Sequence, residues 1–211
     1  MRYEKMIYKD NDSRSKYVVD RYAEKIKGKV LDIGCYDRGL EKALPEGVEY
    51  LGIDFVGEPD IKVNLDEKPE LPFEDGEFDA VVCTEVLEHL DKLYKVWDEI
   101  VRVANKTIVI SLPNCWRTLR RPIEKGEGNV LYYGLPADEA PDRHRWFFNC
   151  ADIEGFFVER AKRQGLKVLD VYAVGNRRGA LKESVRKLLS GSHDRYVNRY
   201  ANSVWVIMEK E

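Results

Sequence analysis

The sequence predicts an α/β fold in which helices cover both faces of a mostly parallel sheet. Two observations carry this prediction. Short apolar runs of the kind that form buried strands alternate with segments of helical periodicity. Glycine and polar turn residues follow several of these runs, as at Gly34. Strands that alternate with helices form parallel sheets, and ligands bind at the carboxyl ends of such strands.

Seven apolar runs are predicted to be strands: residues 29–34, 48–53, 60–63, 78–83, 106–112, 166–174 and 203–209. Four helices are predicted between or before them: residues 15–27, 39–44, 92–103 and 150–164. The first helix is expected because Val18, Tyr22 and Ile26 share one face. The third has an apolar stripe of helical spacing, which consists of Leu93, Val96, Trp97, Ile100 and Val101.

The fourth helix has the clearest boundaries. Asn149 is a suitable N-cap residue, Asp152 stands at the third helical position, and Gly165 ends the helix. Residues 113–148 and 175–202 lack a comparable pattern. We predict that they are insertions in a single domain spanning residues 1–211, and long irregular stretches of this kind usually have a function or are mobile.

Residues 29–54 have the layout of a nucleotide-binding site. Gly34 ends a buried strand in a tight turn, and Asp54 follows 20 residues later, where a carboxylate takes ribose hydroxyls. A dinucleotide site needs a second glycine at the position of Tyr36, whose ring would obstruct a diphosphate. Asp32 places an acidic group before the turn, which suits a cationic cofactor. The pattern therefore favours S-adenosylmethionine (SAM) over NAD.

The chain resembles the class I SAM-dependent methyltransferases, particularly the type 11 branch that includes MetW-like proteins. Four motifs within residues 28–114 carry the resemblance in the family's order: VLDIGC at 30–35, YLGID at 50–54, LPFEDGEFDAVVCTEVLEHL at 71–90 and IVISLPN at 108–114. The resemblance implies a Rossmann-like, seven-stranded sheet whose antiparallel last strand lies beside the sixth. The chain departs from the family at Tyr36, where a second glycine is usual.

The resemblance also implies which residues bind SAM. The expected contacts at the methionine end are Asp32, Gly34, Cys35, Tyr36, Thr84 and Glu85. At the adenosine end, Asp54 is expected to take the ribose hydroxyls and Phe55 to flank the adenine. The stretch Asn64, Leu65 and Asp66 occupies the place where the family contacts the adenine amino group, and either Asn64 or Asp66 could make that contact.

His89 and His144 are weak candidates for a general base. Glu88 and His89 also have the residue types of a metal site, but the other histidines, His144 and His193, lie in segments without a predicted structure. A packing or hydrogen-bonding role for His89 is the simpler interpretation, so no metal site is expected. Cys35 is not expected to be a nucleophile, because the family uses this position as a small turn residue.

The two insertions are expected to form the acceptor site. The candidate acceptor-binding residues are Arg117, Tyr132, Tyr133, Arg143, Arg145, Arg177 and Arg178. Residues 175–202 contain seven basic and two acidic residues in a chain of net charge −3, so an anionic acceptor is expected. A solvated helix face is the alternative. The aromatic run of Trp146, Phe147 and Phe148 either closes over a substrate or anchors its loop in the core.

Composition limits the remaining possibilities. There is no apolar run of 18 residues, and the N-terminus is too charged for a signal peptide. The four cysteines are widely spaced without a C-x-x-C pair, so a reduced, cytoplasmic protein is expected. We expect a monomer or homodimer with no membrane or nucleic-acid partner.

The sequence therefore predicts a methyltransferase that transfers the methyl group of SAM to a small molecule. A SAM-binding protein without transferase activity, acting as a regulatory or partner subunit, is the alternative because no general base is evident. The motif N-P-P-[YF], which would mark methylation of an amide nitrogen or a base, is absent. The sequence does not specify the acceptor or the methylated atom.

Overall fold

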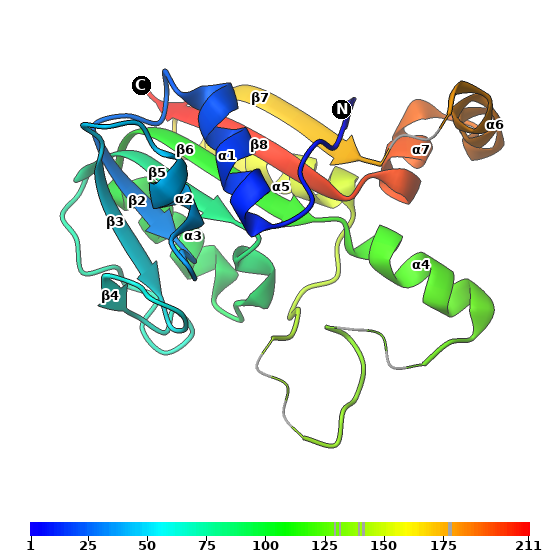
Figure 1. Cartoon of the computed structure of the whole chain (residues 1–211), viewed down its shortest axis with the longest axis horizontal. Coiled ribbons are helices and arrows are strands. Elements are labelled where there is room, and N and C mark those ends of the chain that lie inside the picture. The colour runs from blue at the N-terminus through cyan, green and yellow to red at the C-terminus, as the bar shows by residue number, and fades with distance from the viewer. Residues whose placement is uncertain (129, 131, 139, 141, 177–178) are drawn as a thin grey trace.

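The computed structural model describes residues 1–128, 130, 132–138, 140, 142–176 and 179–211. An eight-stranded sheet lies at its centre, with the strand order β1-β7-β8-β6-β5-β2-β3-β4 (Figure 1). The strands are β1 Arg2–Lys5, β2 Lys29–Ile33, β3 Glu49–Asp54, β4 Ile61–Lys62, β5 Phe78–Thr84, β6 Ala104–Pro113, β7 Leu166–Gly175 and β8 Ser203–Lys210. All seven predicted strands are therefore present.

The last strand is the antiparallel one. β8 pairs antiparallel with both β6 and β7, and every other neighbouring pair is parallel. This arrangement confirms the predicted fold class. The predicted number of strands is too low by one, because β1 pairs with β7 at the edge of the sheet. Only Tyr3 of β1 is buried, so the sequence of this strand has no apolar run to reveal it.

Helices cover the two faces of the sheet, with α1 and α2 in front and α3 and α5 behind in the view of Figure 1. The helices are α1 Asn11–Tyr22, α2 Gly39–Ala43, α3 Leu93–Val103, α4 Cys115–Lys125, α5 Cys150–Arg163, α6 Ala180–Ser190 and α7 His193–Tyr200. A 3₁₀ helix, η1 Leu87–His89, follows β5. No helix of the described part of the chain is long and apolar enough to span a membrane.

Strand alternation decides which side chains meet which helices. On β2, Val30 packs in the apolar cluster under α1 and α2, whereas Leu31 and Ile33 pack in the cluster under α3 and α5. Asp32 therefore points to the same side as Val30, toward α1. The same alternation on β5 directs Val82 and Thr84 to this side. These residues form part of the candidate site.

The first helix begins earlier than predicted. The prediction placed it at residues 15–27, but α1 starts at Asn11 and ends at Tyr22. Asp10 caps it: its carboxylate accepts a hydrogen bond from the Ser13 N–H at 2.9 Å, and the Asp10 N–H donates to the Ser13 hydroxyl at 3.2 Å. The predicted capping box of α5 is confirmed, with Asn149 and Asp152 as reciprocal partners.

The two insertions contain helices that the sequence analysis did not predict. α4 lies within 113–148, and α6 and α7 lie within 175–202. α4 and α6 have little buried surface: Cys115 is the one buried residue described for α4 and Ser190 the one for α6, whereas α7 packs Tyr196 and Val197 in the core. The sequence of α6 nevertheless has apolar residues at helical spacing, Leu181, Val185 and Leu188, but in the structure these side chains are exposed. The three helices lie together at one end of the molecule, beyond β6 and β7 (Figure 1).

Candidate functional site

A cavity lies between the start of α1 and the carboxyl ends of β2 and β5. Asn11, Arg14, Ser15 and Val18 of α1 line one side. The other side is formed by the strand ends and the turn after β2, namely Asp32, Gly34, Cys35, Tyr36, Asp37, Gly39, Leu40, Val82 and Thr84. We call this hollow the α1 cavity. Its place at the carboxyl ends of parallel strands is where ligands bind in open α/β sheets.

Gly34 shapes the turn at the floor of the α1 cavity. Its φ angle of 80° lies in the left-handed region, and its N–H donates a hydrogen bond of 2.8 Å to the Ile53 carbonyl of β3. A Cβ atom at this position would lie 2.2 Å from Cγ2 of Val86. Both the backbone angle and the close approach therefore require glycine. The turn thus places Gly34 in the lining of the α1 cavity.

Asp32 is a buried carboxyl group in the α1 cavity. The Tyr50 hydroxyl donates a hydrogen bond of 3.0 Å to its Oδ2 atom. Burial raises the pKa of Asp32 to about 7, while the hydrogen bond from Tyr50 and the nearby Arg14 guanidinium favour the ionised form. A cation bound beside Asp32 would favour the ionised form further.

Arg14 is the main residue that the sequence analysis missed. It lines the α1 cavity, and its Nε atom is buried without a hydrogen-bond partner among the described residues. Its charge acts on Asp32, Glu85 and Glu88. A signal was present in the sequence, because Asp10 and Ser13 have the spacing of a capping box and would have moved the predicted helix start to include Arg14.

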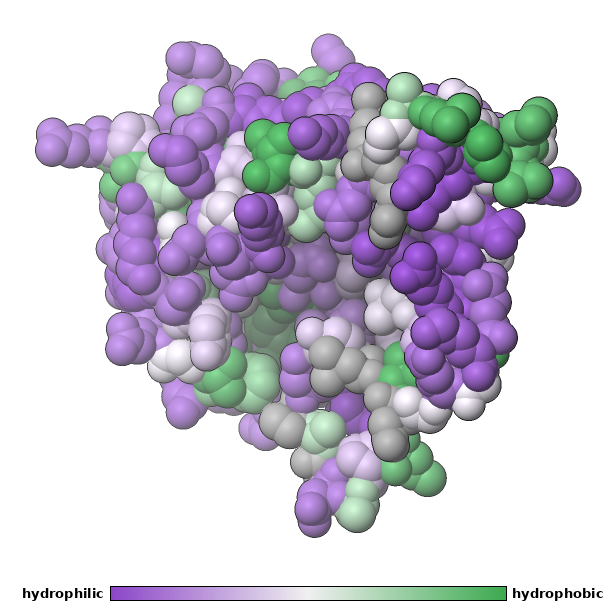
Figure 2. Space-filling model, turned by 45° about the vertical axis from the view of Figure 1, so that its right-hand side comes forward, coloured by the Kyte–Doolittle hydropathy of each residue, from purple (hydrophilic) through white to green (hydrophobic). Residues whose placement is uncertain are grey.

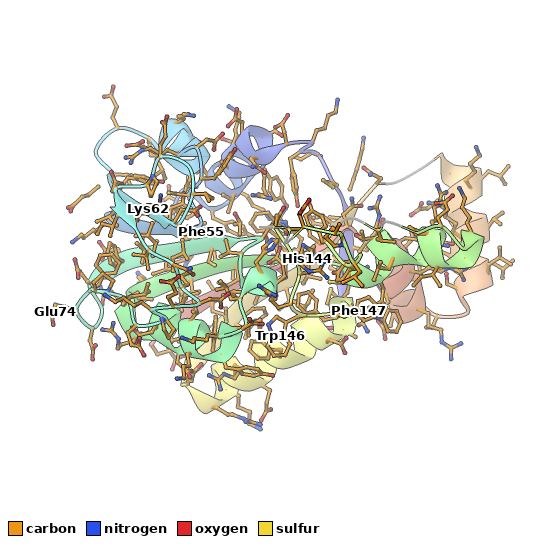
Figure 3. All side chains as sticks on the ribbon, turned by 90° about the horizontal axis from the view of Figure 1, so that it is seen from below. Phe55, Lys62, Glu74, His144, Trp146 and Phe147 are labelled. Atoms are coloured by element: carbon orange, nitrogen blue, oxygen red, sulfur yellow. The ribbon has the colours of Figure 1, made fainter. Side chains whose placement is uncertain are left out.

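Asp54 is fixed at the end of β3 by three backbone groups. Its Oδ2 atom accepts a hydrogen bond from the Tyr36 N–H at 2.9 Å, and its Oδ1 atom accepts from Phe55 and Val56 at 2.7 and 3.1 Å. Each carboxylate oxygen has two lone pairs, so Oδ2 can also accept a hydroxyl group. Phe55 follows at the surface with 46% of its area exposed. Figure 3 shows Phe55 and Lys62 together on this side.

The departure at Tyr36 has a structural explanation. The turn takes the left-handed conformation at Tyr36 and at Arg38, with φ angles of 44° and 61°. Arg38 fixes the turn through ion pairs with Glu41 and Asp60, both at 2.6 Å. The Tyr36 side chain is half-exposed at the rim, and its N–H is directed to Asp54. The turn therefore links the cavity to the Asp54 edge without a second glycine.

The stretch after β4 lies apart from the α1 cavity. Leu65 is buried in the core, the Asn64 side chain bonds to Glu67 and to the Asp66 N–H, and Asp66 accepts a hydrogen bond from Lys92. The structure does not bring these three residues into the cavity lining. Contact of Asn64 or Asp66 with an adenine stays a prediction.

Two predicted residues at the methionine end differ in environment. Thr84 lines the α1 cavity. Glu85 has a left-handed φ angle of 57° and accepts a hydrogen bond of 3.0 Å from the Ser111 hydroxyl. Burial raises the pKa of Glu85.

Cys35, in the turn after β2, is not a reactive nucleophile in this environment. Burial raises the pKa of its thiol to about 12, so the reactive thiolate form is absent near neutral pH.

His89 is the last residue of η1, and His144 lies beside it, next to Glu88. The His89 and His144 rings meet edge to face at 4.7 Å, and His144 stacks on Tyr132 at 4.4 Å. Glu88 is only 1% exposed, and burial together with the neighbouring Glu85 raises its pKa well above the ordinary value. Burial lowers the pKa of His144 to about 4, so this imidazole is neutral at physiological pH.

The predicted acceptor residues divide into two groups. Tyr132, Tyr133, Arg143 and Arg145 lie near η1: the Tyr133 hydroxyl bonds to His144, and the Arg145 N–H donates to the Glu88 carbonyl at 2.8 Å. The Arg143 guanidinium donates to the Gly134 carbonyl, so that cation is engaged within its own loop.

The other predicted arginines lie elsewhere. Arg117 is on α4, where burial lowers its pKa and the neighbouring Arg120 and Arg121 contribute to this effect. The structure does not bring Arg117 into the α1 cavity. Arg177 and Arg178 lie outside the described residues.

The aromatic run before α5 borders a second, apolar hollow between α3 and α5. Its lining includes Tyr94, Trp146, Phe147 and Phe156. Trp146 anchors the loop, because its Nε1–H donates a hydrogen bond of 2.7 Å to the Leu90 carbonyl. Phe147 is 56% exposed and remains available to a ligand. Figure 3 shows His144, Trp146 and Phe147 close together between the sheet and α4.

Figure 2 shows a hollow in the surface of the molecule, with apolar residues at its floor and hydrophilic residues around much of its rim. The arrangement therefore offers a charged cavity at the strand ends and, after β5, a region lined by aromatic and histidine side chains. Such a pairing can hold a cofactor in one part and a reaction partner in the other.

Comparisons with known proteins identify the fold. Residues 31–109, which run from within β2 to within β6 and include η1 and α3, match a family described as a methyltransferase domain. No curated protein sequence is significantly similar to the chain. A SAM-dependent methyltransferase from Archaeoglobus fulgidus is 20% identical, with 95% of each chain covered and a TM-score of 0.60.

Two further solved structures have the same architecture. The magnesium protoporphyrin IX methyltransferase of Synechocystis PCC 6803, with S-adenosylhomocysteine bound, is 15% identical over 95% of this chain and 81% of that chain, with a TM-score of 0.55. The [4+2]-cyclase SpnF is 16% identical over 94% of this chain and 81% of that chain, with a TM-score of 0.57. The chain thus has the fold of class I SAM-dependent methyltransferases, and the matched domain supports the predicted cofactor, SAM.

Proposed function

We propose that the protein binds SAM in the α1 cavity and transfers its methyl group to a small-molecule acceptor. The observation that carries the proposal is the pairing of Arg14 and Asp32 in one cavity. The methionine end of SAM has a carboxylate and an ammonium group. A cavity that offers one cation and one carboxyl group complements both charges, whereas the diphosphate of a dinucleotide would meet the carboxyl group of Asp32.

The adenosine end would extend toward Asp54. The Asp54 carboxylate lies at the end of β3 and accepts a hydrogen bond from the N–H of Tyr36, a residue that also lines the α1 cavity. One ligand can therefore reach from Arg14 across the turn to Asp54. Phe55, half-exposed next to this carboxylate, offers an aromatic face to the adenine.

The acceptor would enter beside η1. Methyl transfer from a sulfonium mainly requires alignment of the nucleophile with the methyl group. Thr84 lines the cofactor cavity, and the chain continues directly into Glu85, Glu88 and His89. Tyr132, Tyr133 and Phe147 provide aromatic surface for the acceptor. The arginines of the insertions, with the basic segment 175–202, support the expectation of an anionic acceptor.

A SAM-binding protein without transferase activity is the second candidate. One observation favours it: the same architecture occurs in a [4+2]-cyclase, so the fold alone does not define methyl transfer.

Our proposal that the protein belongs to the MetW-like branch rests on the four sequence motifs. A reducing, cytoplasmic location is also part of our proposal, because Cys35, Cys83, Cys115 and Cys150 are free and buried.

Calorimetric titration tests the cofactor assignment. SAM and S-adenosylhomocysteine should bind to the wild type, and NAD should not. Asp54→Ala should weaken SAM binding by roughly ten- to 150-fold, since loss of a charged acceptor costs about 1.5–3 kcal/mol. Asp20→Ala, at an exposed position near the end of α1 and outside the cavity lining, is the matched control and should bind as the wild type does. Equal affinity of Asp54→Ala and wild type would remove Asp54 from the site.

Turnover separates the two candidate functions. The protein should form S-adenosylhomocysteine from SAM when it is incubated with a panel of small anionic acceptors. If SAM binds but no acceptor of this class or any other is methylated, the non-transferase function is correct. Binding of NAD in place of SAM would contradict both candidate functions.

A further inference from the structure

The residues Glu88, His89 and His144 form a cluster that the SAM site does not use. A carboxylate oxygen of Glu88 and one ring nitrogen of each histidine all lie within 4.8 Å of one another. Glu88 and His89 belong to η1, while His144 comes from the insertion more than 50 residues later. The hydrogen bonds from the Arg145 N–H to Glu88 and from Trp146 to Leu90 hold the insertion against η1.

One oxygen of the Glu88 carboxyl group lacks the partner that a buried carboxyl oxygen normally has. The Glu88 side chain is 1% exposed, and its Oε2 atom has no hydrogen-bond partner among the described residues. Its Oε1 atom lies 3.6 Å from Nε2 of His89, beyond ordinary hydrogen-bond length. A buried carboxylate in this condition is costly unless a cation or donor completes it.

Both histidines are oriented as metal ligands are. Nδ1 of His144 lies 2.8 Å from the Tyr133 hydroxyl, and Nδ1 of His89 lies 3.1 Å from the Arg143 carbonyl and 3.0 Å from the Asp142 carboxylate. An Nδ1–H that donates to such an oxygen leaves the Nε2 lone pair free. A histidine that binds a metal usually donates its other ring N–H to an oxygen in this way.

We propose that Glu88, His89 and His144 bind a divalent first-row transition metal ion such as Zn²⁺, Co²⁺ or Mn²⁺. Two imidazoles and one carboxylate suit these ions, whereas Ca²⁺ and Mg²⁺ prefer oxygen ligands alone. Ligand atoms at about 2.1 Å from a metal lie roughly 3–4 Å apart, so small side-chain rotations would complete the site. Three protein ligands leave a coordination position open for water or an acceptor oxygen.

Titration with Co²⁺ tests the site in the full chain. The wild type, after treatment with a chelator and removal of the chelator, should bind one Co²⁺ ion per chain and develop visible absorption bands. Glu88→Gln and His144→Gln should each weaken binding at least about tenfold. Glu88→Gln keeps the size of the side chain, and retained SAM affinity would show that the variant is folded.

Two further variants make the test specific. His193→Asn removes the exposed histidine whose Nε2 contacts the Met1 carbonyl, and it should leave Co²⁺ binding unchanged. Tyr133→Phe removes the oxygen partner of His144 and should weaken binding roughly tenfold. Absence of stoichiometric binding to the wild type, or equal binding by wild type and Glu88→Gln, would overturn the proposal. These readouts do not require methyl transfer, so they are independent of the proposed function.

Discussion

Arg14 and Asp32 show how single residues give the α1 cavity its chemistry. Asp32 faces α1 because it alternates with Leu31 and Ile33 along β2, and Arg14 enters the same cavity from the second turn of the helix. The buried Nε atom of Arg14 has no hydrogen-bond partner among the described residues. A bound carboxylate would supply one.

Arg14→Met should therefore weaken SAM binding at least about tenfold, because the variant loses a charge-assisted hydrogen bond worth roughly 1.5–3 kcal/mol. Adenosine, which has no carboxylate, should bind equally to the variant and the wild type. Calorimetry with both ligands measures the difference. Lys16→Met, an exposed position on the same helix, is the control. Equal losses for SAM and adenosine would show that Arg14 only supports the fold.

Asp32 should make both stability and cofactor binding depend on pH. Its pKa rises from the ordinary value of 3.8 to about 7 in the folded protein. The folded state therefore retains a proton that the unfolded chain releases, so this group lowers the free energy of unfolding as pH rises from about 4 to about 7. The charges of Arg14, Asp37 and Asp54 and the hydroxyl of Tyr50 also act on Asp32.

As pH rises, the contribution of Asp32 to the unfolding free energy of the wild type should fall, while the affinity of the wild type for SAM increases. Between about pH 5 and about pH 8, the unfolding free energy of Asp32→Asn should increase relative to that of the wild type, because the amide cannot ionise. SAM affinity of the wild type should instead increase over this range, as the carboxylate that pairs with the ammonium group forms. Denaturant unfolding and calorimetry at several pH values measure both. A pH-independent difference would place the pKa of Asp32 outside this window.

At the scale of elements, the capped start of α1 is part of the site. The helix begins at Asn11, so Asn11, Arg14 and Ser15 all reach the α1 cavity. The prediction that began the helix at residue 15 relied on the apolar stripe at Val18 and did not use the cap. α5 is capped by the equivalent device at Asn149, on the other face of the sheet.

The two caps provide a matched pair of variants. Asp10→Ala and Asn149→Ala should each lower the melting temperature by a few degrees, because each removes hydrogen bonds to the first turn of a helix. Only Asp10→Ala should also weaken SAM binding, because only α1 forms the cavity. Melting curves and calorimetry distinguish the effects. A similar loss of SAM affinity in both variants would mean that the cap of α1 acts through global stability alone.

At the scale of the whole molecule, the proposed SAM site connects α1 with β2, β3 and β5. A ligand that binds only the folded state stabilises all of these elements together. SAM at about 100 times its dissociation constant should add roughly 2.7 kcal/mol, which corresponds to an increase in melting temperature of roughly 5–10 °C for a chain of this size. NAD should cause no shift. A thermal-shift measurement in which NAD raises the melting temperature and SAM does not would overturn the cofactor assignment.

The sequence by itself determined seven of the eight strands, their class of sheet and the residues of the turn after β2. Buried strands reveal themselves because both faces are covered and their sequences are continuously apolar. β1 escaped prediction because only Tyr3 is buried. α6 was missed although Leu181, Val185 and Leu188 recur at helical spacing, and α7 although it packs Tyr196 and Val197 in the core.

Only the tertiary structure decided which distant residues meet. Arg14 joins Asp32 because α1 packs over β2, and His144 joins Glu88 because the insertion folds back onto η1. The environments of these groups likewise depend on burial: the same residue types in solvent would have ordinary pKa values and complete hydration. Motif spacing identified one half of the proposed SAM site, and packing between segments far apart in the chain supplied the other half and the histidine cluster.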